Sequence, residues 1–157
     1  MSVHRPSPRG ARIGSMAQKM TDDQWRAFVS VGTRTGKLST VRADGRPHIA
    51  PVWFVLDGDD LVFNTAKESV KGRNLARDPR ASFCVDDDRP PYSFVVCEGS
   101  VTISEEPAEL VEWATRIGGR YMGAEQAEDF GRRNGVPGEL VVRLRVEKVV
   151  ALADLAE

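Results

Sequence analysis

Short apolar runs separated by turn residues dominate the chain, and their alternation predicts an antiparallel sheet with a few helices. Residues 37–42 and 48–56 flank Asp44-Gly45, a pair typical of a tight hairpin turn. In the run at 48–56 apolar side chains fall on both faces, so we expect one continuous strand that is covered on both sides. Further strand patterns occupy residues 61–63, 80–85, 92–103 and 140–146.

Helical patterns occur between these strands. Thr21 opens a Thr-Asp-Asp-Gln sequence that resembles a capping box and leads into an apolar helix face. Ser69 is a candidate N-cap for a short helix that ends at Asp78-Pro79. A longer helix begins near Pro107, and a polar helical segment follows at 124–134. The apolar stripe of the longer helix is interpreted as core packing and comprises Leu110, Ala114, Ile117 and Tyr121.

The order of these elements predicts a mainly β (α+β) fold, an antiparallel barrel with peripheral helices and not a doubly wound parallel sheet. A length of 157 residues suits one domain. Residues 1–19 carry four cations and no acid among Ser, Pro and Gly, so we interpret them as a disordered basic arm or a start-site artefact, with Met16 or Met20 as the true start. The folded domain is expected at 20–157.

Charge and composition exclude several classes of function. A net charge of −1 gives no field that favours nucleic acid or an anionic membrane. No run is long enough to span a bilayer and no secretory signal is visible, so a cytoplasmic protein is expected. Cys84 and Cys97 lie in apolar strands as buried thiols, and the acidic run 86–88 fits a solvated turn, so no metal site is expected.

Residues 63–77 carry the strongest chemical signal, because a strand ends there in hydroxyls and cations where a helix begins. Free backbone N–H groups after Ser69 would attract an anion. Lys67, Lys71 and Arg73 bring positive charge to the same place. This pattern predicts a phosphate site, although a solvated basic helix end would have the same sequence.

Three strings in order resemble the pyridoxamine 5′-phosphate oxidase superfamily, and most closely its actinobacterial branch of enzymes that depend on the deazaflavin F420. They are Leu-Ser-Thr-Val-Arg-Ala-Asp-Gly-Arg-Pro-His-Ile-Ala-Pro-Val-Trp-Phe at 38–54, Lys-Gly-Arg-Asn-Leu-Ala-Arg-Asp-Pro-Arg-Ala-Ser at 71–82 and Glu-Gly-Ser-Val-Thr-Ile at 98–103. The resemblance covers about residues 21 to 154 and implies an antiparallel split β-barrel, like that of FMN-binding proteins. It also implies a homodimer with each cofactor in a groove between the subunits.

The resemblance assigns roles to individual residues. Lys71 would bind the cofactor phosphate, assisted by Thr65, Ser69, Arg73 and Asn74. The ring system would lie along the strand formed by His48, Ile49, Ala50, Pro51, Val52 and Trp53. Tyr92 and Ser93 would reach the cofactor of the second subunit. No catalytic side chain is assigned, and His48 could equally be a surface histidine and Trp53 a barrel-packing residue.

The expected function is therefore that of an F420H2-dependent oxidoreductase acting on a small organic molecule, with the chemistry supplied by the cofactor. FMN is the alternative cofactor in the same site, and a non-catalytic flavin-, deazaflavin- or haem-binding module is the alternative function. Pyridoxamine phosphate is not expected as substrate, because the chain ends Val-Val-Ala-Leu-Ala-Asp-Leu-Ala-Glu, without the Trp-Arg and Arg-Leu segment of the oxidases proper. The expected partners are a second copy of the chain and a small-molecule substrate, with neither nucleic acid nor membrane.

Overall fold

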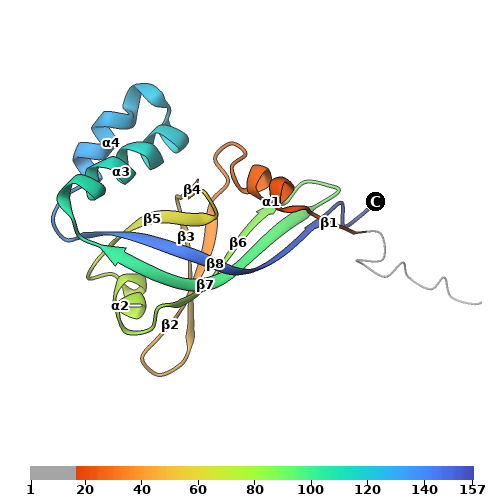
Figure 1. Cartoon of the computed structure of the whole chain (residues 1–157), viewed down its shortest axis with the longest axis horizontal. Coiled ribbons are helices and arrows are strands. Elements are labelled where there is room, and N and C mark those ends of the chain that lie inside the picture. The colour runs from red at the N-terminus through yellow and green to blue at the C-terminus, as the bar shows by residue number, and fades with distance from the viewer. Residues whose placement is uncertain (1–16) are drawn as a thin grey trace, which may run out of the picture.

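The computed structural model describes residues 17–157. Most of the predicted arm, residues 1–16, lies outside the described residues, while Gln18 and Lys19 form a short strand that pairs with the last strand. Figure 1 labels the elements along the chain. Their order is β1 (Gln18–Lys19), α1 (Asp22–Val29), β2 (Gly36–Val41), β3 (Pro47–Val52), β4 (Val55–Asp57), β5 (Asp60–Ala66), α2 (Val70–Arg77), β6 (Arg80–Asp87), β7 (Ser93–Ser104), α3 (Pro107–Met122), a 3₁₀ turn (Ala124–Gln126), α4 (Ala127–Asn134) and β8 (Glu139–Ala153).

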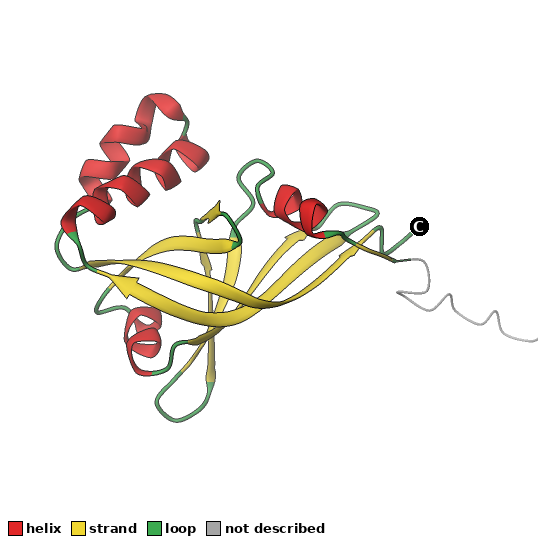
Figure 2. Ribbon diagram, viewed as in Figure 1, coloured by secondary structure: helices red, strands yellow, loops and turns green. Residues whose placement is uncertain are grey.

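All these strands belong to one antiparallel sheet with the order β3-β2-β6-β7-β8-β5-β4, and β1 is added on β8. The two strands at the ends of this order, β3 and β4, are separated in the chain only by Trp53 and Phe54. The sheet must therefore curl until its two edges meet at this link, although no ladder of hydrogen bonds joins β3 to β4. This confirms the predicted split β-barrel with helices at its periphery (Figure 2).

The prediction of one continuous strand at 48–56 is wrong, because the chain bends at Trp53-Phe54. Side chains satisfy the backbone of Phe54 at the bend: its N–H donates to the Tyr121 hydroxyl (3.2 Å) and its carbonyl accepts from the Arg120 guanidinium (2.8 Å). The expected cover on both sides is also absent from the chain as described. Ile49 is 68% exposed and Pro51 is exposed, which suits an edge strand, where proline's missing N–H costs no ladder bond.

The barrel interior holds the main core. Phe54 and Phe83 meet edge to face with ring centroids 4.8 Å apart, and Phe63 packs near them. A smaller cluster fills the space between α3 and the outer face of β5 and β8, where Leu110 and Trp113 contact Val62 and Val141. The apolar stripe of α3 is confirmed as packing, since Leu110, Ala114 and Ile117 are buried and Tyr121 is half-buried.

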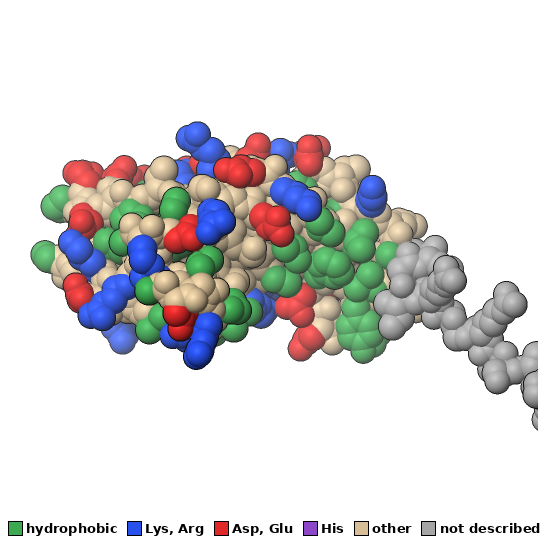
Figure 3. All heavy atoms as spheres, turned by 90° about the horizontal axis from the view of Figure 1, so that it is seen from below, with side chains coloured by type: hydrophobic (Ala, Val, Ile, Leu, Met, Phe, Trp, Pro, Cys, Tyr) green, Lys and Arg blue, Asp and Glu red, His purple; other side chains and the backbone are tan. Residues whose placement is uncertain are grey.

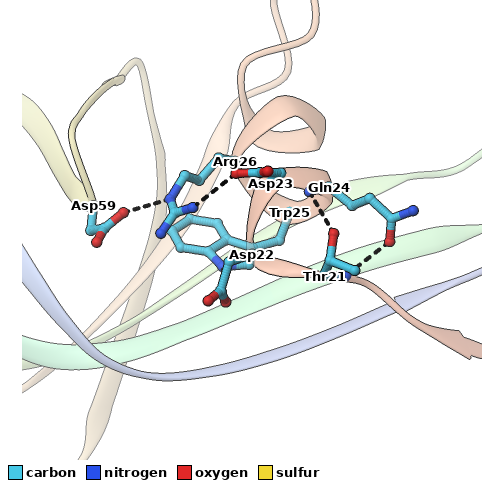
Figure 4. A network of polar contacts seen from close by, with 7 residues as sticks. All are labelled: Thr21, Asp22, Asp23, Gln24, Trp25, Arg26 and Asp59. Atoms are coloured by element: carbon cyan, nitrogen blue, oxygen red, sulfur yellow. Dashed lines mark hydrogen bonds and ion pairs between the residues drawn. The ribbon is translucent and has the colours of Figure 1, made fainter.

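The first helix begins as its sequence predicts (Figure 4). The Thr21 hydroxyl accepts from the Gln24 backbone N–H, and the Gln24 side chain accepts from the Thr21 N–H, which completes a capping box. Trp25 is buried against the barrel, while the Arg26 guanidinium donates to Asp59 beyond β4. The helix is therefore fixed against the barrel beside the turn between β4 and β5 (Figure 1).

The long strands β7 and β8 pair antiparallel, and their register shifts at a bulge between Glu98 and Gly99. A Cβ atom on Gly99 would lie 1.9 Å from the Arg145 carbonyl oxygen, which is backbone and cannot rotate away. The close approach of the two strands therefore requires glycine at this position.

Gly99→Ala should lower the free energy of unfolding by about 1–3 kcal/mol, the usual cost of overpacking, as measured by urea denaturation. Gly119→Ala is the matched control, because its Cβ would meet only the Ala127 methyl at 3.4 Å inside a helix. That control should be neutral or stabilising. Equal stabilities of the two variants would contradict this account of the bulge.

Candidate functional site

The turn into α2 is a compact hydrogen-bonded unit. The Ser69 hydroxyl donates to the Ala66 carbonyl (2.7 Å) and accepts from the Gly72 N–H (3.0 Å), so Ser69 is the N-cap, as predicted. The Thr65 hydroxyl lies 3.0 Å from that of Ser69 and must donate to it, because the Ser69 proton is already directed at Ala66. Both predicted phosphate-assisting hydroxyls thus use their protons to build the turn.

The three cations of this region differ in their partners. The Lys67 ammonium pairs with Glu105 (3.1 Å) and the Arg73 guanidinium with Glu68 (2.9 Å). Lys71, half-buried in the first turn of α2, makes no ion pair with any residue in the range 17–157. It is therefore the cation of this cluster whose charge is available to a ligand.

A cavity of 260 Å³ lies where the end of β3, the outer face of β5 and β8, and the start of α2 meet α3 and the end of α4. Four of the predicted cofactor-binding residues line it together, which are Pro51, Val52, Trp53 and Lys71. The remaining walls come from residues that sequence reasoning did not assign, namely Asn64, Ala114, Ile117, Gly118, Asn134 and Glu139.

Trp53 forms a fixed aromatic wall of this cavity. Its ring stacks on that of Tyr121 with centroids 5.0 Å apart and planes 4° apart, and Phe130 of α4 lies 6.0 Å away. The Tyr121 hydroxyl donates to the Arg34 carbonyl (2.8 Å) while it accepts from Phe54 N–H. Burial raises the pKa of Tyr121, so the phenol keeps the proton that this arrangement needs. Trp53 is 39% exposed, and its place is at the cavity, not in the barrel core.

Glu139, the first residue of β8, is the acidic group that sequence reasoning missed. Burial raises the pKa of its carboxyl, and the positive charge of Lys71 acts in the opposite direction. The alternation of Glu139, Val141 and Arg143 against the core residues of β8 was visible in the sequence. What it could not show was that the start of this strand pairs with Ala66, beside α2.

Arg73 and Asn74 lie apart from that cavity and line a separate depression of 310 Å³ with Arg42, Asp44 and Arg77. Asn74 is buried and bonded within the chain, since its amide donates to the Thr40 hydroxyl (3.0 Å) and its oxygen accepts from Arg77 (3.0 Å). In this structure Asn74 therefore ties α2 to β2, and Arg73 is exposed at the mouth of the second depression.

The residues predicted to follow the cofactor ring divide between the two faces of β3. His48, Ala50 and Val52 alternate with Ile49 and Pro51, and only the last three positions before Phe54 reach the cavity. His48 pairs with Thr40 in the ladder, and its Nδ1 atom is buried without a partner among the described residues. The structure thus places His48 against the β2–α2 side of the sheet.

Tyr92 and Ser93 lie outside the cavity formed by their own chain. The Tyr92 carbonyl accepts from the Leu155 N–H (2.9 Å), and the Ser93 hydroxyl accepts from the Asp154 N–H (3.1 Å). Both residues thus fix the C-terminal segment, and their contact with a second subunit stays a prediction.

Other candidate chemistry is weak in the described part of the chain. Residues 17–157 contain no group of His, Cys, Asp and Glu side chains arranged to hold a metal ion. Asp86 pairs with Lys37 and Asp87 with Arg34, and burial raises the pKa of the Cys97 thiol to about 12, which leaves it unreactive.

Within residues 17–157 no helix is both long and apolar enough to cross a bilayer. Figure 3 shows basic and acidic side chains interspersed over one face.

Comparisons with solved structures give the same fold. The chain is 29% identical to a conserved hypothetical protein of Mycobacterium tuberculosis, with a TM-score of 0.74 and 84% of each chain covered. An F420 reductase (24% identity, TM-score 0.63, 79% of this chain and 94% of that chain covered) shares the fold. A haem-binding protein of Mycobacterium smegmatis does so as well (23% identity, TM-score 0.67, 89% and 57% covered).

One curated relative is similar over a shorter stretch. The 5a,11a-dehydrotetracycline/5a,11a-dehydrooxytetracycline reductase of Streptomyces rimosus is 39% identical over 56 residues, which is 33% of this chain and 39% of that protein. A family model described as pyridoxamine 5′-phosphate oxidase matches residues 21–153, almost the whole described part. The chain therefore belongs to the pyridoxamine 5′-phosphate oxidase family.

Proposed function

We propose that the protein is an F420H2-dependent oxidoreductase that works as a homodimer and transfers a hydride between the deazaflavin and a small organic substrate. Membership of an oxidase family and the F420 reductase neighbour support an oxidoreductase. The observation that carries the proposal is the cavity at the end of β3, where Lys71, unpaired within residues 17–157, and the flat face of Trp53 lie together.

The residues present fit a ring cofactor with a phosphate. Lys71 would hold the phosphate, because no carboxylate of the described chain neutralises its ammonium and the capped start of α2 offers backbone N–H groups beside it. Pro51, Val52 and Trp53 would hold the ring and keep water from it. When bound, the cofactor supplies the hydride, and the chain's residues orient the two reactants.

F420 is favoured over FMN by the arginines beside the site. F420 carries carboxylates beyond its phosphate, and Arg42, Arg73 and Arg77 line the neighbouring depression at α2. Arg77 is partly used, since it donates to the Val41 carbonyl (2.8 Å), and Arg73 pairs with Glu68 (2.9 Å), but Arg73 and Arg42 are both exposed at the surface. These cations would attract the tail that FMN lacks.

A non-catalytic haem- or flavin-binding module is the second candidate, supported by the M. smegmatis neighbour with the same fold. The absorbance spectrum and mass of the cofactor retained or taken up by the purified protein separate the candidates. A Soret band would favour the haem module, and oxidation of F420H2 by an added organic acceptor would favour the enzyme.

Lys71→Ala should weaken cofactor binding about 10- to 100-fold, the equivalent of a hydrogen bond to a charged group of about 1.5–3 kcal/mol. Fluorescence titration of F420 measures the change. Lys67→Ala is the control, because that ammonium is exposed and already paired with Glu105. Equal affinities of wild type and Lys71→Ala would move the phosphate site elsewhere.

Binding of F420 should be tighter than that of FMN, and the advantage should shrink as salt rises, since exposed charge pairs contribute only about 0–1 kcal/mol each and are screened. Parallel titrations at low and high ionic strength measure it. Arg73→Gln should weaken F420 more than FMN. If FMN binds more tightly at both salt concentrations, FMN and not F420 is the cofactor.

The protein should be a homodimer that buries on the order of 2,000 Å² or more, because the exposed edge strand β3 forms only one wall of a cofactor groove. Ile49→Asp should shift the population towards monomer in light scattering, since Ile49 is 68% exposed on that strand. A wild-type protein that is monomeric at micromolar concentration with cofactor bound would rule out the shared groove.

A further inference from the structure

Glu139 is held rigidly at the cavity by its backbone. Its N–H donates to the Val136 carbonyl (3.1 Å), and the preceding Gly138 carbonyl accepts from the Lys67 N–H (2.8 Å). Gly138 adopts φ +95°, a conformation that favours glycine. The tight turn between α4 and β8 therefore fixes the backbone position of Glu139, on the sheet face that α3 covers.

The carboxylate of Glu139 has no partner within the described range. It makes no ion pair or side-chain hydrogen bond there, although Lys71 lines the same cavity. Its neighbour Asn64 donates only weakly, at 3.5 Å, to the Leu140 carbonyl. Glu139 is half-buried at the cavity, and this burial raises the pKa of its carboxyl. A desolvated carboxylate without a donor gains most from a ligand that brings one.

The other walls limit the shape of that ligand. Trp53 offers an aromatic ring fixed by Tyr121, while Ala114, Ile117 and Gly118 of α3 make the wall that this helix contributes apolar. Gly118 allows α4 to approach, because a Cβ there would lie 2.5 Å from the Phe130 Cβ, so this wall has little room to open. At 260 Å³ the space that one chain encloses is near the small end for ligand cavities, so the cofactor proposed above would extend beyond it, and a separate ligand beside Glu139 is limited to a planar molecule of one or two rings.

We propose that Glu139 is the specificity-determining residue of this cavity: it selects small planar molecules that present a hydroxyl or N–H donor to its carboxylate. That such a molecule is the substrate of hydride transfer rests on the function proposed above. The binding preference itself does not depend on that function, because Glu139, Trp53 and α3 line the cavity whether or not the protein catalyses hydride transfer.

The test uses two probes of similar size: 2-naphthol and its methyl ether 2-methoxynaphthalene, which has no donor. The full-length protein is titrated by calorimetry, with and without added F420. Binding in the cavity is located by the indole N–H signal of Trp53 in a nitrogen–proton correlation spectrum, assigned with Trp53→Phe. This readout requires no turnover.

Wild type should bind 2-naphthol at least about tenfold more tightly than the ether, as expected for a hydrogen bond to a charged acceptor. In Glu139→Gln the preference for the hydroxyl should fall to about threefold or less, because a neutral acceptor remains. Glu147→Gln, at an exposed position of the same strand β8, is the matched control and should keep the wild-type order.

The proposal is overturned if 2-naphthol leaves the Trp53 signal unmoved, if wild type binds the alcohol and the ether equally, or if Glu139→Gln keeps the full preference. Thermal unfolding of the two glutamate variants checks that both remain folded. Should the preference hold while F420H2 is never oxidised, the cavity inference stands and the hydride-transfer function fails. If F420H2 is oxidised and the preference is absent, the function stands and the cavity inference fails.

Discussion

The bend at Trp53-Phe54 is the constraint on which the rest of the structure depends. It joins the two outermost strands of one sheet, so the sheet can exist only as a curled, nearly closed barrel. Phe54 points into the barrel with no exposed surface, and Trp53 points out to the cavity. Barrel core and candidate site are therefore built on adjacent residues, and a change in one alters the geometry of the other.

Helix α3 holds this bend in place through polar contacts. The Arg120 guanidinium donates to the carbonyls of Val29, Gly32 and Phe54 at 2.7, 3.0 and 2.8 Å. Those three carbonyls lie in segments that no strand pairing connects. One side chain therefore joins α1, the loop before β2 and the bend at Trp53-Phe54. Hydrogen bonds from a charged donor are worth about 1.5–3 kcal/mol each, and a neutral replacement would leave three carbonyls without that donor. Because the same helix lines the cavity, its position determines the position of the site.

Local signals allowed much of the fold to be predicted from the sequence. Asp44-Gly45 lies in the β2–β3 turn, Thr21 and Ser69 cap their helices, and the stripe beginning at Leu110 is buried, because each depends on residues only a few positions apart. The continuous strand at 48–56 was wrong, because apolar alternation cannot show that Arg120 and Tyr121, more than sixty residues later, satisfy the backbone of a bend. The family resemblance supplied the split barrel and brought Lys71 and Trp53 to one site. It did not reveal that Asn74 is used internally, nor that Glu139 lies in the same cavity, since both facts depend on pairing distant segments.

The candidate site is organised by two charges that do not meet. Lys71 and Glu139 face one cavity without an ion pair, although the positive charge of Lys71 partly offsets the cost of burying the Glu139 carboxylate. A direct contact would have filled the cavity with protein and satisfied both groups, as happens for Lys67 and Glu105 at the exposed rim. Keeping them apart costs folding free energy, because two partly desolvated groups lack partners in the described chain. That cost is recovered when a ligand supplies an anion to the lysine and a donor to the carboxylate, which is the arrangement expected of a site preorganised for binding.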